Sequence, residues 1–176
     1  DPSLAVTITS GSLGSATVTD TLADVTGTLS RSSGSDVGGY NILLGSGSVA
    51  ANYDITFSNT NQAFAITPRP ITLTAAAAQS KVYGNSDPTY SYAVEASGAS
   101  RGIVVGDSFT GALARTAGEN VSSSYALNQG SLANSNYAIS FAPNDFAITP
   151  RAITLTADAG QSKVYGNSDP TYSYAV

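Results

Sequence analysis

The sequence predicts an all-β fold made of tandem small modules, β-sandwich-like or β-grasp-like, joined by short stiff linkers. One observation is a repeat: residues 66–94 and 148–176 lie 82 residues apart (148 − 66) and differ only at 70/152, 76/158 and 78/160. Another is that large apolar residues alternate with small or polar ones over short runs, which is typical of strands with one buried face. Turn-forming residues separate these runs, and no long run has a helical period.

Strands are expected at 71–74, 89–94, 109–114 and 137–141, where the alternation is clearest. Turns are expected at 84–88, 105–107, 117–120 and 134–136, which are rich in Gly, Asn, Asp and Ser. The alanine run at 75–78 favours helix by composition, but it is short and follows a Thr-rich strand, so we expect a loop or a strand end there. Inward-facing Tyr, Phe, Ile, Leu and Val would form the core, with tyrosine hydroxyls reaching its edge.

The repeat divides the chain into three parts. Residues 1–69 are expected to be an incomplete first repeat lacking its opening strand, 70–151 a complete repeat, and 152–176 the opening segment of a third. The junctions between the parts contain Pro68, Arg69, Pro150 and Arg151. Proline fixes its own φ and extends the residue before it, so these linkers should be stiff.

Composition excludes several classes of function. The chain has no Cys and no His, its charged fraction is 11%, and its formal net charge is −5. We therefore expect no nucleic-acid partner, no membrane insertion in this segment, no metal, no cofactor and no enzymatic activity. The scattered acids Asp107 and Glu119 are interpreted as turn residues. Arg31 and Arg115 recur at equivalent places, as do the linker arginines, and are interpreted as anchors of loops or junctions.

Several ordered motifs occur together in this chain. Lys-x-Tyr-Gly is followed by Asn-Ser-Asp-Pro-Thr-Tyr, then by Thr-Gly-x-Leu-x-Arg-x-x-Gly, by Asn-Tyr-x-Ile-x-Phe and by the Ile-Thr-Pro-Arg linker. The residues of the repeat motif are Lys81, Tyr83, Gly84, Lys163, Tyr165 and Gly166. Together these motifs resemble the MBG repeats, YGX type, of large secreted bacterial adhesins and filamentous haemagglutinin-like surface proteins. The resemblance implies an extracellular location, secreted or attached to a bacterial surface, and an array of many copies.

The two lysines hold the same repeat position, which suggests two roles. A buried Lys81 could form an amide crosslink with Asn85, Asp87 or Asp107, because a desolvated lysine loses its charge and becomes nucleophilic. The alternative is an edge-strand lysine that discourages unwanted pairing. Residues 85–87 could supply oxygen ligands to calcium, although turn capping explains them as well.

Two classes of function remain open from the sequence. The first is structural: a stalk or filament module of a bacterial surface adhesin, whose partners are further copies of the repeat. The second is recognition, in which the modules bind a host or cell-surface glycan, or each other. Because 152–176 matches what 1–69 lacks, one chain could complete another by head-to-tail strand addition. Alternatively, the repeats continue covalently.

Overall fold

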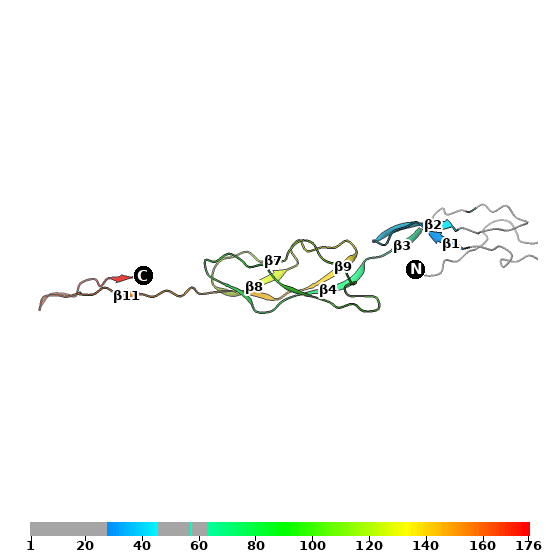
Figure 1. Cartoon of the computed structure of the whole chain (residues 1–176). Helices are drawn as coiled ribbons and strands as arrows, with labels where there is room; N and C mark the ends of the chain where they lie inside the picture. The colour runs from blue at the N-terminus through cyan, green and yellow to red at the C-terminus, as the bar shows by residue number, and fades with distance from the viewer. Residues whose placement is uncertain (1–27, 46–56, 58–62) are drawn as a thin grey trace, which may run out of the picture. The chain divides into compact units, whose positions relative to one another are not determined.

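The computed structural model describes residues 28–45, 57 and 63–176. These residues form twelve short strands and no helix, which confirms the all-β prediction (Figure 1). The described part of the chain accordingly contains no helix with the length and apolarity needed to span a membrane. The chain divides into two compact units, Asp1–Pro70 with Ser135–Ala138, and Ile71–Asn134 with Ile139–Val176. Each unit is described by itself.

The first unit contains one antiparallel sheet of three strands in the order β1-β2-β3. Its strands are β1 (Leu29–Arg31), β2 (Gly38–Leu44) and β3 (Ala63–Ile66). Phe64 of β3 lies opposite Tyr40 of β2, so two aromatic residues face each other across the pair. Such cross-strand aromatic pairs stabilise a small sheet and help to fix its register.

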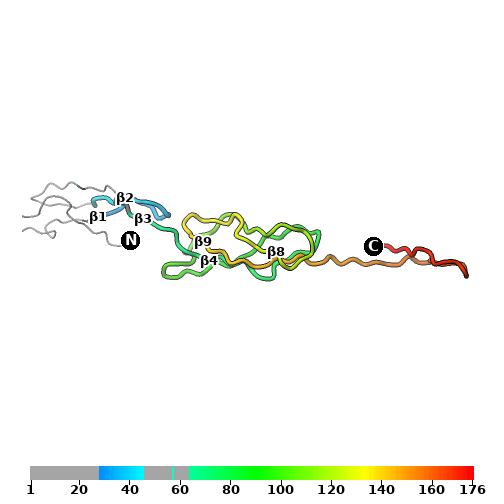
Figure 2. The backbone as a smooth tube through the Cα atoms, turned by 180° about the vertical axis from the view of Figure 1, so that it is seen from behind, coloured from blue at the N-terminus to red at the C-terminus, as the bar shows by residue number. Residues whose placement is uncertain are grey.

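The second unit contains most of the regular structure, in two sheets with the orders β5-β10-β8-β7 and β6-β4-β9. The strands of these sheets are β4 (Arg69–Ala75), β5 (Gln79–Val82), β6 (Tyr92–Val94), β7 (Ala114–Arg115), β8 (Ser122–Asn128), β9 (Tyr137–Ala142) and β10 (Asp145–Thr149). The first two residues of β4 and of β9 are assigned to the first unit. Figures 1 and 2 show β4 and β9 towards one end of this unit and β8 further from that end, and Figure 1 shows β7 beside β8. The two sheets therefore follow one another along the unit.

The core of the second unit comes from the alternating positions of its strands. In β4 the buried residues are Ile71, Leu73 and Ala75, and in β10 they are Phe146 and Ile148. This period of two is the pattern that the sequence predicted. The composition of the core differs from the prediction, because no described valine is buried and Tyr137 is the one buried tyrosine among the described residues. Aliphatic side chains and one phenylalanine do most of the packing.

The alanine run is a turn, as expected, and it joins β4 to β5 through Ala78, whose φ is 59°. Strand β5 then pairs with β10 in parallel, with Lys81 opposite Ile148 and Val82 opposite Thr149. The chain enters β5 from β4 and leaves the module from the carboxyl end of β10. The entering and leaving segments are therefore direct neighbours that run in the same direction.

Two predicted strands are shorter in the structure. Strand β6 covers only 92–94 of the predicted 89–94, because the backbone N–H of Ser91 donates to the side chain of Gln79 instead of to a neighbouring strand. The prediction of a strand at 109–114 is wrong over most of its length. Thr110 makes an isolated bridge to Ala133, and regular pairing begins only at β7. The predicted turns at 84–88, 105–107, 117–120 and 134–136 all lie between strands.

Residues 150–176 form a small hairpin, β11 (Thr156–Ala157) with β12 (Tyr174–Ala175). Every residue of this stretch is exposed. The register pairs Thr156 with Ala175, as Thr74 pairs with Ala93 in the complete module. The second copy of the opening segment, residues 152–176, therefore adopts the local pairing of the first copy, residues 70–94, although it buries none of its side chains.

Candidate functional site

The most distinctive group of side chains is a charged cluster formed by Lys81, Asp87, Arg115 and Glu119. Lys81 comes from β5 and has a side chain only 5% exposed, because alternation along this short strand turns it inward. Asp87 comes from the Asn-Ser-Asp turn after β5, and Arg115 ends β7. The cluster thus joins β5 and the turn after it to β7 and the turn that follows β7.

The four charges alternate in sign around the cluster. Lys81 Nζ lies 2.6 Å from Asp87 Oδ1 and 2.5 Å from Glu119 Oε2. Arg115 Nε lies 2.8 Å from Asp87 Oδ2, and Arg115 Nη2 lies 2.6 Å from Glu119 Oε1. Each carboxylate therefore bridges both cations. This arrangement suits the rigid fork of a guanidinium, which binds carboxylates with two donors.

Aromatic rings surround Arg115. Its guanidinium carbon lies 5.1 Å from the ring centre of Tyr125 and 5.6 Å from that of Phe146. Tyr90 donates a hydrogen bond of 2.6 Å from its hydroxyl to Asp87, and its ring meets Phe146 edge-on with centres 5.4 Å apart. These contacts shield the cluster from water on one side and strengthen its electrostatics.

The cluster shifts the pKa of each of its acids. Hydrogen bonds from Arg115 hold the pKa of Asp87 well below its usual range, although burial opposes the shift. The hydrogen bond from Lys81, and then that from Arg115, lowers the pKa of Glu119. Hydrogen bonding to Asp87 and Glu119 raises the pKa of Lys81. All four groups therefore stay ionised at neutral pH, and none is poised to exchange a proton.

A shallow depression of about 380 Å³ lies beside the cluster. It is lined by Asp87, Tyr90, Ala114, Arg115, Thr116, Ala117, Gly118 and Glu119. The charged groups on its wall are already paired with each other. Among the described residues no group of His, Cys, Asp and Glu has the arrangement of a metal site.

A second set of contacts holds the linker residue Arg151, which follows β10. Arg151 donates from Nε to the Tyr83 carbonyl at 2.9 Å and from Nη2 to Asn85 Oδ1 at 2.5 Å. The backbone N–H of Tyr83 donates to the carbonyl of Thr149 at 2.9 Å, which extends the pairing of β5 with β10 by one bond. The predicted linker residue and the predicted repeat motif therefore meet in the structure.

A model of one protein family matches residues 1–62 and 71–147, and its description is MBG domain, YGX type. The chain belongs to this family. No curated protein and no solved structure matches the sequence or the fold. The family model ends just before the Ile-Thr-Pro-Arg segment in each copy, so the linkers fall outside the matched residues.

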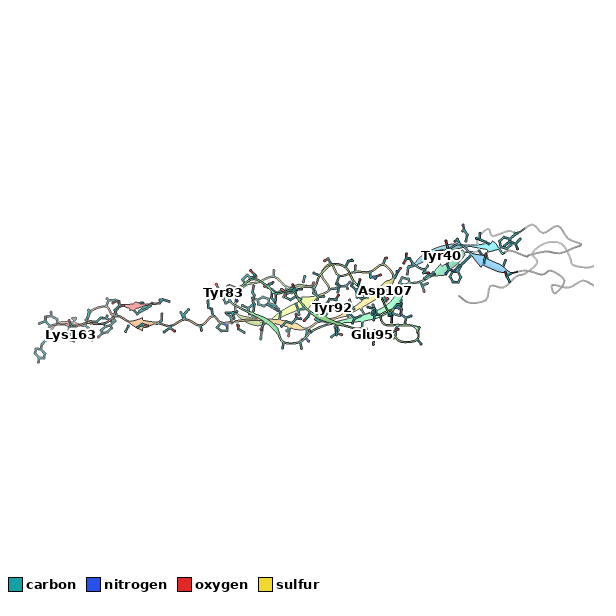
Figure 3. All side chains as sticks on the ribbon, in the orientation of Figure 1. Tyr40, Tyr83, Tyr92, Glu95, Asp107 and Lys163 are labelled. Atoms are coloured by element: carbon teal, nitrogen blue, oxygen red, sulfur yellow. The ribbon has the colours of Figure 1, made fainter. Side chains whose placement is uncertain are left out.

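The structure of this MBG domain places Lys81 in contact with one of its three proposed crosslink partners. Lys81 contacts Asp87, whereas Asn85 binds Arg151. Figure 3 shows Asp107 towards the opposite end of the unit from Tyr83, the residue two positions after Lys81. An amide between Lys81 and Asp87 would release one water. The charges that Arg115 and Glu119 stabilise on the two groups favour an ion pair over this amide, and an intact mass decides between them.

The motif residues Lys163 and Tyr165 have different surroundings from their counterparts Lys81 and Tyr83. Lys163 contacts Asp169 of its own segment, but its side chain is 47% exposed, against 5% for Lys81. Tyr165 is fully exposed. In the other junction, Pro68 lies between β3 and β4, and the N–H of Arg69 donates to the Asn136 carbonyl.

Sequence reasoning missed the role of Arg115 and Glu119. The signal for the arginine was present, since it recurs 84 positions after Arg31 within Arg-x-x-Gly. The structure shows that both arginines donate to the carbonyl of the glycine three residues later and lie beside a tyrosine ring. Arg31 Nη1 donates to the Gly34 carbonyl at 2.7 Å and its guanidinium lies 4.9 Å from the ring centre of Tyr40. No sequence signal connected Glu119 with Lys81, 38 residues away.

Proposed function

We propose that this chain is a structural module of a bacterial adhesin, secreted or attached to the cell surface, and that it acts as a non-enzymatic spacer in series with further copies. Membership of the MBG family supports an extracellular repeat module. The observation that carries the spacer role is the parallel pairing of β5 with β10. Recognition of a glycan stays a prediction from the sequence.

Parallel pairing determines how the module responds to tension along the chain. Force from the preceding residues reaches β5 through β4, at the amino end of β5. Force from the following residues acts on β10 at Thr149, its carboxyl end. In a parallel pair these ends are opposite, so the two strands are pulled past each other and their hydrogen bonds share the load. Rupture then requires several bonds to break together.

The contacts at the exit support the same role. Arg151 fixes the linker to residues 83–85 by two hydrogen bonds, and Thr149 Oγ1 donates to the Lys81 carbonyl at 3.2 Å. Pro150 between them has a restricted φ. A fastened linker transmits force to the sheet without a slack segment.

Single-molecule force spectroscopy on the full chain tests the proposal, and the absence of native cysteine allows two pulling directions. Handles at Thr67→Cys and Ala152→Cys load β5 and β10 in shear. Handles at Ser86→Cys and Ala152→Cys load the adjacent carboxyl ends of the same strands and peel them apart. Forced unfolding depends on the unfolding barrier, which differs with direction. We expect a clearly higher unfolding force in shear. Equal forces in both directions would contradict the proposal that the β5–β10 pair resists tension along the chain.

A further inference from the structure

Asn136, which belongs to the repeat at 70–151, makes three hydrogen bonds to residues of the repeat at 1–69. Its Oδ1 accepts from the backbone N–H of Val37 at 2.9 Å, and its Nδ2 donates to Asp36 Oδ1 at 2.8 Å. Its backbone carbonyl accepts from the N–H of Arg69 at 2.9 Å. All four residues belong to the first unit. One asparagine therefore contacts both the turn before β2 and the first residue of β4.

The two side-chain bonds require a donor and an acceptor at residue 136. The backbone N–H of Val37 needs an acceptor and the carboxylate of Asp36 needs a donor, and a carboxamide offers one of each. These partners also determine which way the amide of Asn136 points. Aspartate at this position would keep the acceptor but lose the donor, and it would place a second negative charge beside Asp36.

The turn that binds Asn136 is held in place by side chains of its own sheet. The Tyr40 hydroxyl donates to the carbonyl of Asp36 at 2.7 Å, and Arg31 Nη1 donates to that of Gly34 at 2.7 Å. The guanidinium carbon of Arg31 lies 4.9 Å from the centre of the Tyr40 ring. The backbone of the turn is therefore already fixed where the asparagine binds it, which lowers the entropic cost of the contact.

The same turn recurs in the repeat at 70–151. Asn120 and Val121 stand 84 positions after Asp36 and Val37 (120 − 36). The Tyr125 hydroxyl donates to the carbonyl of Asn120 at 2.8 Å, as the equivalent tyrosine does in the first unit. Asparagine and aspartate both offer a side-chain oxygen to a donor. The second copy of the turn thus keeps the groups that the first copy uses to bind Asn136.

The binding asparagine recurs at the same spacing. Asn52 precedes Tyr53 as Asn136 precedes Tyr137, 84 residues later (136 − 52). Asn52 and Tyr53 lie outside the described residues. Both copies of the repeat therefore carry the turn and the asparagine in their sequence. A head-to-tail array needs this combination, because the same contact can then form at each junction.

We propose that the turn containing Asp36 and Val37 is a docking surface for the following repeat, and that Asn136 anchors that repeat on it. Consecutive repeats are then coupled by an interface at each junction, in addition to the covalent linker. The inference deepens the proposed spacer role, on which its purpose in an array rests. The contact itself involves neither β5 nor β10.

Hydrogen exchange of the Val37 amide, measured by NMR on the full chain, tests the proposal. Asn136→Ala removes both side-chain bonds, so the Val37 amide should exchange about tenfold faster, the effect of one lost hydrogen bond. The matched control is Asn134→Ala, which removes a donor to the Ser108 carbonyl from the same loop. We expect the control to leave the Val37 rate unchanged. Equal Val37 rates in the two variants would overturn the proposal.

A pair of substitutions tests the chemistry of the contact. Asn136→Asp keeps the size of the side chain but brings two carboxylates together, so the Val37 amide should exchange faster than in the wild type. Adding Asp36→Asn supplies the missing donor from the other side and should bring the rate back close to that of the wild type. An acceleration that the second substitution does not reverse would overturn the proposal, even if the single variant unfolds.

These exchange rates are independent of the pulling experiment. Equal unfolding forces in the two pulling directions would contradict the spacer role and leave the Val37 rates as they are. Unchanged Val37 rates in Asn136→Ala would remove the docking contact and leave the shear geometry of β5 and β10 intact. The two proposals can therefore fail separately.

Discussion

Replacing Arg115 with alanine should destabilise the second unit more than any other single change in the charged cluster. The side chain is 6% exposed and binds both carboxylates of the cluster. It also donates to the carbonyls of Thr116 and Gly118. Alanine would remove these bonds and leave Asp87 and Glu119 facing each other with Lys81 alone.

The size of the effect follows from the exposure of the partners. Removing one member of a buried ion pair costs roughly 3–5 kcal/mol. Asp87 is 34% exposed and Glu119 is 67% exposed, so water replaces part of the lost interactions and the cost falls to the lower end of that range. The aromatic contacts of Arg115 with Tyr125 and Phe146 are also lost. We expect a loss of about 3 kcal/mol in the free energy of unfolding of this unit.

Hydrogen exchange measured by mass spectrometry can assign the effect to the correct unit. Peptides from β8 and β10 should exchange about 150-fold faster in the variant, if exchange follows the opening equilibrium. Arg101→Ala is a matched control, because this arginine pairs with Glu95 but its side chain is 57% exposed. Exposed pairs contribute little to stability, so the control should exchange like the wild type.

The comparison between the two arginines can refute the reasoning. If Arg115→Ala and Arg101→Ala gave the same exchange rates in β8 and β10, the charged cluster would not brace the module. Arg115→Lys provides a second comparison. Lysine keeps the charge but loses the planar fork, so we expect an intermediate rate.

Three further predictions concern the same module. Stability should be constant near neutral pH and fall from about pH 5 downwards, because the folded pKa of Asp87 is depressed, chiefly by hydrogen bonds from Arg115; urea midpoints against pH would show this, and a midpoint rising on acidification would contradict it. Gly118→Ala should lower the urea midpoint, since φ is +145° and a Cβ would lie 2.5 Å from the Tyr125 ring. The intact mass should show no loss of water from an amide between Lys81 and Asp87, and a loss of one water would show the crosslink.

The fold class could be predicted because its signals are local. The alternation in β4 and β9, the turn after β5 and the loop of the alanine run all follow from neighbouring residues. The wrong strand at 109–114 also looked locally correct. There, Gly111 has a φ of 88° and its backbone passes close to Ser131, so the chain leaves the extended conformation. A tertiary approach between distant segments overrode the local pattern.

The cluster could be predicted only in part, because its members come from distant segments. Lys81 and Asp87 were singled out together, and the structure places them in contact. Arg115 was noticed through its repetition but interpreted as a loop anchor. Its hydrogen bonds to Thr116 and Gly118 agree with that interpretation. Its bonds to the acids depend on the packing of β7 beside β8 and could not be deduced from spacing.

The comparison of the two copies indicates which parts of the cluster the module requires. Arg31 and Arg115 keep the same backbone acceptors and the same two aromatic neighbours. The glycine three residues later is also kept, because the facing tyrosine ring leaves no room for a Cβ at Gly34 or Gly118. The acid after that glycine is not kept. The arginine beside the aromatic rings is therefore the part of the cluster that both copies share, whereas Glu119 has Ser35 as its counterpart.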